Sequence, residues 1–167
     1  MELIDRIENS RFLAREFLLW LWYESDRLEG RVEVEDGDFV ELWFEETLVL
    51  TDAIAEVRLK APMPTTTPEA FEALRQGKRP ALAKLRITRG TQAWTLTYKA
   101  ETTSLSGVTL PAELREDDDE GFYERVNLVE QVEAMVAQLM GRFLALRCSR
   151  SWGRSVVPKL QAWVQAG

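Results

Sequence analysis

Residues 17–23 read FLLWLWY, a run of seven large apolar or aromatic side chains that leaves a helix no polar face. The pair Asn9-Ser10 before it is typical of a helix cap, so we expect a helix from about Arg11 to Arg27. A helix that is apolar all round must be covered on every side. Two alternatives follow: a central core helix, or a helix that binds a partner protein through Trp20 and Trp22.

Alternation of apolar and polar residues predicts two groups of strands separated by a short helix. The first group is expected near residues 32–34, 39–50 and 55–59, with the middle strand interrupted at Glu45-Glu46. The second group is expected near residues 83–87, 94–98 and 104–110. Thr67-Pro68 is typical of a helix start and Gly77 of a helix end, so the short helix falls between the two groups.

A long helix is expected from about Gly121 to Cys148, with apolar residues spaced by three and four from Phe122 to Leu146. Leu128, Met135 and Met140 make this stripe wider than one neighbouring sheet needs. A last helix is expected at about 155–165. We therefore predict a single α+β domain spanning residues 1–167: an antiparallel sheet with helices on one side, namely a buried N-terminal helix, a short middle helix and a long C-terminal helix.

The set of reactive side chains argues against an enzyme. The chain has no histidine and one cysteine, Cys148, which removes His-dependent nucleophiles and thiolate metal clusters. It contains no glycine-rich phosphate-binding motif. The acidic run 116–120 lacks the spaced ligands of a calcium loop and suits the solvated start of a helix. We therefore expect no catalytic residue, no cofactor and no metal site.

Seven basic and no acidic residues lie between positions 75 and 99, which we call the basic segment. Several of them alternate with apolar residues and share one predicted face of a strand pair. Binding to a phosphate backbone requires several cations on one surface. The alternative is a solvated face that pairs with acidic segments of this chain or of a second copy. The candidate DNA-binding residues are Arg75, Lys78, Arg79, Lys84, Arg86, Arg89 and Lys99.

A second basic group, with no acids nearby in sequence, lies at the C-terminal end of the chain. Basic residues near helix ends are common because they complement the helix dipole. This group bears on DNA binding only if the fold places it beside the basic segment. Its members are Arg142, Arg147, Arg150, Arg154 and Lys159.

Four stretches occur in the order LVLTDAIAEVRLK, TPEAFEALRQGKRPALAKLRI, QAWTLTYKAETTSLSGVTLP and FYERVNLVEQVEAMVAQL. Over residues 48–146 they resemble the C-terminal half of the recombination-associated RdgC proteins, and REFLLWLWYESD is similar to a segment of some long relatives. The resemblance implies a ring-shaped homodimer that encircles duplex DNA without sequence preference and restrains the recombinase RecA. It also implies that Lys78, Arg79, Lys84 and Arg86 face the DNA.

Two functions therefore remain open for a non-catalytic, cytoplasmic protein that does not enter a membrane. The first is weak, non-specific binding to duplex DNA through the basic segment, by a homodimer related to recombination control. The second is an adaptor or inhibitor that binds a partner protein through an apolar aromatic surface, for which the candidate residues are Trp20, Trp22, Met135, Met140 and Trp163. A carboxylate-based enzyme is a third alternative. Neutralisation of the basic side chains by neighbouring carboxylates would favour protein recognition over DNA.

Overall fold

The computed structural model describes residues 3–111 and 119–167, with side chains from residue 12 onward. The helices are α1 (Leu3–Arg27), α2 (Pro68–Arg75), α3 (Asp119–Arg147) and α4 (Val157–Ala166), with a 3-10 turn at Pro64–Thr66 and a π-helical turn at Trp152–Val156. The strands are β1 (Arg31–Glu35), β2 (Asp38–Thr51), β3 (Glu56–Lys60), β4 (Arg79–Arg89), β5 (Gln92–Lys99) and β6 (Ser104–Thr109). The predicted order of helices and strands is confirmed.

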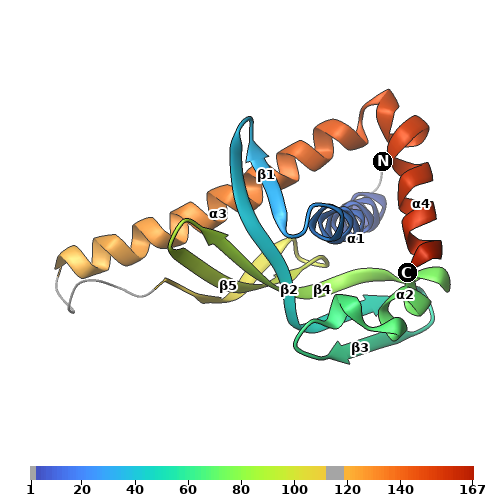
Figure 1. Ribbon diagram of the computed structural model, residues 1–167, viewed down its shortest axis with the longest axis horizontal. Coiled ribbons are helices and arrows are strands. Elements are labelled where there is room, and N and C mark those ends of the chain that lie inside the picture. Colours follow the sequence, from blue (N-terminus) through green and yellow to red (C-terminus); the bar gives the residue numbers. More distant parts are fainter. Residues whose placement is uncertain (1–2, 112–118) are drawn as a thin grey trace.

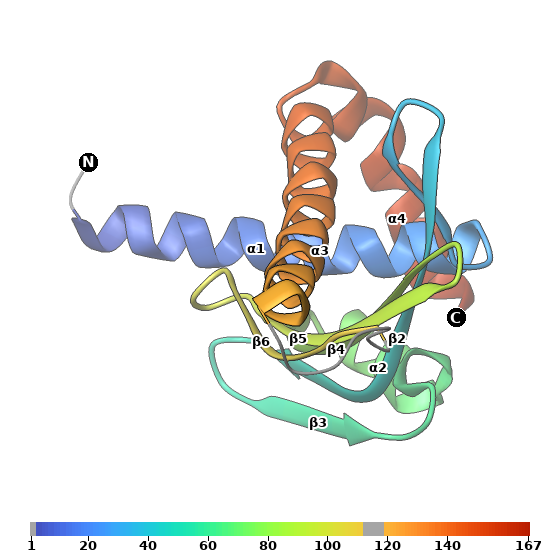
Figure 2. The ribbon, with the colours of Figure 1, turned by 90° about the vertical axis from the view of Figure 1, so that its left-hand side faces the viewer.

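The strands form one antiparallel sheet in the order β1-β2-β4-β5-β6, and β3 pairs with the far end of β2. Helices α1 and α3 lie over the same side of this sheet and cross one another (Figures 1 and 2). The inward residues of β5, which are Trp94, Leu96 and Tyr98, are at most 3% exposed and meet these helices in one hydrophobic core. The α+β fold class predicted from the sequence is therefore confirmed.

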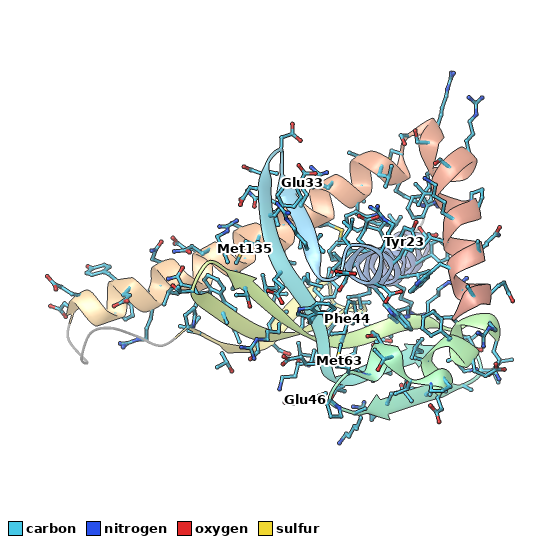
Figure 3. All side chains as sticks on the ribbon, viewed as in Figure 1. Tyr23, Glu33, Phe44, Glu46, Met63 and Met135 are labelled. Carbon is cyan, nitrogen blue, oxygen red and sulfur yellow. The ribbon has the colours of Figure 1, made fainter. Side chains whose placement is uncertain are left out.

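Strand β2 is continuous for 14 residues, so the interruption predicted at Glu45-Glu46 does not divide it. The sequence signal instead marks a β-bulge, because the pairing of β2 with β4 shifts register between Phe44 and Leu48. Glu46 has a φ of 55°, in the left-handed region, as expected at such an irregularity. The bulge directs Glu45 and Glu46 to the sheet face away from α3, where Figure 3 shows Glu46.

Helix α1 starts at Leu3, and the predicted start at about Arg11 is wrong. Asn9 and Ser10 lie inside the helix, where each costs only a few tenths of a kcal/mol relative to better helix formers. The segment Phe17–Tyr23 is buried as the core-helix alternative requires, with every side chain at most 8% exposed. Figure 2 shows the N-terminal part of α1 extending beyond the sheet and α3.

The predicted apolar stripe of α3 is only partly buried. Val132, Leu139 and Phe143 are fully buried between the helix and the rest of the core. Phe122 and Val126 are 55% and 38% exposed, because the first turns of α3 extend past the sheet (Figure 1). The first part of the predicted stripe therefore faces the solvent.

The short helix α2 begins at Pro68 after Thr67, as predicted. The Thr67 hydroxyl, however, donates to the main-chain oxygen of Pro64 at 2.8 Å and does not cap the helix. Phe71 of α2 packs against Trp22 of α1, with ring centroids 5.3 Å apart. The middle helix is thus joined to the same core as α1.

Candidate functional site

The candidate DNA-binding residues do not form one surface. Lys84 and Arg86 lie on the outer face of β4, where they alternate with buried residues, as predicted. Lys78 is 7% exposed and belongs to the interior. Arg75 and Arg79 line a separate cleft beside α4. The remaining two lie at opposite ends of the β4–β5 hairpin, Arg89 beside the turn and Lys99 at the open end.

Five of the seven candidate side chains form ion pairs with carboxylates. The pairs and their N–O distances are Arg75–Glu72 (3.4 Å), Lys78–Asp52 (3.5 Å), Lys84–Glu46 (2.5 Å), Arg86–Glu45 (3.6 Å) and Arg89–Asp38 (2.8 Å). Four of these carboxylates belong to β2 or to the residue that follows it, and β2 is the neighbour of β4 in the sheet. The acidic N-terminal third of the chain thus neutralises much of the basic segment.

The Asp52 carboxylate, which pairs with Lys78, also forms hydrogen bonds with the main chain of the turn that follows β2. Its Oδ1 atom accepts hydrogen bonds from the main-chain N–H groups of Ala55 and Ile54, both at 2.8 Å. These two bonds and the nearby Lys78 ammonium lower the pKa of Asp52 below its usual value of 3.8. The ion pair therefore holds the turn between β2 and β3, and Lys78 is not available to a ligand.

The second basic group is also partly neutralised, by acidic residues near the N-terminal end of the chain. Arg142 contacts Glu33 at 3.1 Å and Asp36 at 3.6 Å, on the hairpin formed by β1 and β2. Arg147 contacts Glu16 of α1 at 2.7 Å. These pairs join α3 to acidic residues of the N-terminal region. Two of the five basic residues are therefore engaged in ion pairs within the chain.

Four of the five candidate partner-binding residues lie within the domain's own packing. Trp20, Trp22 and Met135 are at most 5% exposed, and Figure 3 shows Met135 on α3 facing the interior. Trp163 is half-buried; its ring lies 5.3 Å from that of Trp22, and its Nε1 donates to Asp26 at 2.6 Å. Trp20, Trp22 and Met135 therefore offer no surface to a partner in this conformation, and Trp163 is engaged by Trp22 and Asp26 within the chain.

The fifth candidate, Met140, lies in an apolar groove of about 670 Å³ where α1, β6 and α3 meet. In Figure 2 these three elements come together to the left of α3. The aliphatic lining comes from all three: Leu13 and Ala14 of α1, Leu105 of β6, and Val136, Met140 and Leu144 of α3. Leu144 is 39% exposed, so this lining reaches the solvent.

The polar side chains that line the groove are those of Tyr98, Thr103, Ser104 and Glu133. Tyr98 of β5 contributes to the lining, and burial raises its pKa to about 12, so the phenol is neutral at physiological pH. Glu133 of α3 contributes the only carboxylate among the described lining residues. A cavity with an apolar lining and a few polar groups is typical of a recognition site.

The sequence identified Met140 through the excess width of the α3 stripe, and Leu144 lies one turn further along the same helix. Leu13 and Leu105 carry no comparable signal. Each is a single apolar residue in its own element, and only the packing of α1 and β6 beside α3 brings them together.

Two other features are absent from residues 3–111 and 119–167. No group of three potential metal-ligating side chains occurs there, and residues 116–118 of the acidic run lie outside the described residues. No helix of the described part of the chain has the length and apolar character needed to span a membrane. Comparison of the chain with protein-family models, with curated proteins and with solved structures found no match.

Proposed function

We propose that this chain is a non-catalytic binding protein that recognises a helical segment of a partner protein in the groove between α1, β6 and α3. The observation that carries the proposal is the continuous aliphatic lining contributed by three elements distant in sequence. Exposed apolar surface in a concave site commonly marks a place where another protein binds.

The shape of the surroundings favours a helical ligand. One wall of the groove is α3, a helix of 29 residues, and beyond Glu133 and Glu130 the same face of this helix carries the exposed Val126 and Phe122. An amphipathic helix that packs along such a wall buries side chains at spacings of three and four residues. This extends the surface available to a ligand well past the groove itself.

Duplex DNA is the less favoured ligand because most of the side chains that would bind it are already paired with carboxylates of the chain. Five of the seven have carboxylate partners within the chain, and the net charge is −7. Each paired carboxylate would have to be displaced, or would remain close to a phosphate.

A photo-crosslinking amino acid introduced at Met140 tests the proposal in the native cell. The matched control carries the same amino acid at Thr97, on the opposite face of the sheet from the groove. We expect a covalent adduct with a discrete polypeptide at position 140 and none at position 97, with the crosslinked residues identified by mass spectrometry.

A Met140→Glu substitution in a chain that carries the crosslinker at Leu144 should abolish the adduct, because a carboxylate in an apolar interface is left unpaired. Equal yields at positions 140 and 97, or no adduct at either position, would contradict the proposal.

A further inference from the structure

The groove and the exposed start of α3 belong to one helix face. Phe122 and Met140 are 18 residues apart, as are Val126 and Leu144, and this spacing corresponds to about five turns of an α-helix. Each pair therefore lies on the same side of α3. The apolar stripe from Phe122 to Leu144 is about 33 Å long at 1.5 Å per residue.

Two carboxylates interrupt this stripe, Glu130 and Glu133. Both side chains are exposed, and Glu133 lines the groove. Neither forms an ion pair with a basic side chain among those that the structure describes. Arg15, which follows the lining residue Ala14 on α1, is already close to Glu101, at 3.9 Å. The described surface that a ligand would meet is thus apolar with an excess of negative charge.

We infer that the ligand of this groove is an amphipathic helix whose apolar stripe is flanked by lysine or arginine. This inference rests on the proposed function, since it names the partner of the same site. A basic flank would pair with Glu130 and Glu133, whereas an acidic flank would place like charges against them. The net charge of −7 also favours the approach of a cationic segment.

Two designed helical peptides with the same pattern of leucines test the inference, one with lysines and the other with glutamates at all remaining positions. Binding of each fluorescent peptide to the chain of residues 1–167 is measured by anisotropy. We expect the leucine–lysine peptide to bind at least about 10-fold more tightly than the leucine–glutamate peptide. Glu133→Lys should reduce the affinity of the leucine–lysine peptide about 5- to 10-fold, because it replaces an attraction by a repulsion.

The control for net charge is Glu69→Lys, which makes the same charge change on the exposed surface of α2, away from the groove. Equal affinities for the two peptides, or equal effects of Glu133→Lys and Glu69→Lys, would overturn the inference. If Met140→Glu still weakened binding in that case, the groove would remain a helix-binding site. If neither peptide binds, or if Met140→Glu leaves peptide affinity unchanged, the proposed function is contradicted as well. If the protein is a homodimer and Met140→Glu makes it dissociate, the groove binds a second copy of the chain. That result would also overturn the inference.

Discussion

The indole Nε1 of Trp94 donates a hydrogen bond to the main-chain oxygen of Leu128 at 3.0 Å, in the interior of the domain. Trp94 is fully buried on the inner face of β5, and Leu128 is in the second quarter of α3. The bond therefore fixes both the position of α3 along the sheet and its rotation about its own axis. That rotation directs Val132 into the core, leaves Phe122 and Val126 exposed, and leaves Met140 partly buried.

Trp94→Phe should destabilise the protein by about 2 kcal/mol, through loss of the hydrogen bond and of part of a buried ring. Trp43→Phe is the matched control, because the Trp43 indole donates at the surface to Glu41, at 2.6 Å. That change should cost less than about 1 kcal/mol. Urea denaturation followed by circular dichroism measures both values, and equal costs would contradict the anchoring role of Trp94.

Gly30 should tolerate alanine much less well than Gly37. Both have positive φ, 84° and 80°, so alanine at either position costs about 1 kcal/mol in backbone strain. A Cβ at Gly30 would also lie 2.4 Å from the Trp43 ring, whereas a Cβ at Gly37 meets nothing within 4 Å. Gly30→Ala should therefore cost a further 1–3 kcal/mol, approximately. The excess should shrink in a Trp43→Phe background, and a double-mutant cycle measured by denaturation tests this.

Asp52→Ala should destabilise the protein more than Asp52→Asn. Asparagine retains an oxygen for the N–H groups of Ile54 and Ala55 and loses only the charge beside Lys78, whereas alanine loses both interactions. Because the folded-state pKa of Asp52 is lowered, its charge stabilises the fold above about pH 4. The difference between the wild type and Asp52→Asn should disappear as the pH falls through the folded-state pKa. Thermal denaturation between pH 2.5 and 7 measures it, and a difference independent of pH would be inconsistent with this role.

Tyr98→Phe should change the alkaline stability of the protein. The folded-state pKa of Tyr98 is about 12 and the usual value is 10.0, so the unfolded chain loses this proton first as the pH rises. The stability contributed by the neutral phenol is complete below pH 10 and is lost between about pH 10 and 12. The wild type should therefore lose more stability than Tyr98→Phe over this interval, in denaturation curves recorded at each pH. Parallel losses would show that the phenol of Tyr98 titrates normally.

Duplex DNA should bind weakly or not at all at about 150 mM salt, since most of the candidate cations are paired. Neutralising two of their partners, in a Glu45→Gln, Glu46→Gln double variant, should free Arg86 and Lys84 and increase the affinity at low salt. A titration of labelled duplex at two salt concentrations measures both proteins. A wild-type dissociation constant below about 1 µM at 150 mM salt, with a steep salt dependence, would restore DNA as the leading ligand.

Local patterns were sufficient for most of the fold. Alternation predicted strands near residues 83–87 and 94–98, and their apolar members Leu85 and Trp94 are buried. The break at Glu45-Glu46 was detected, but its form as a bulge inside one strand depends on the pairing with β4. The candidate site was less predictable. Met140 was identified from helical spacing, whereas Leu13 and Leu105 belong to elements whose position beside α3 has no local signal.

By itself, the sequence determined which elements form and which of their faces are apolar, because both depend on residues a few positions apart. The fully apolar Phe17–Tyr23 segment required burial in any fold that this chain adopts. The tertiary structure alone decided which charges meet. It placed the acids of β2 against the bases of β4, and it left Glu130 and Glu133 exposed beside an apolar groove. Ion pairing acts across a few ångströms of space, and those distances are set by the order of strands in the sheet and by the rotation of α3.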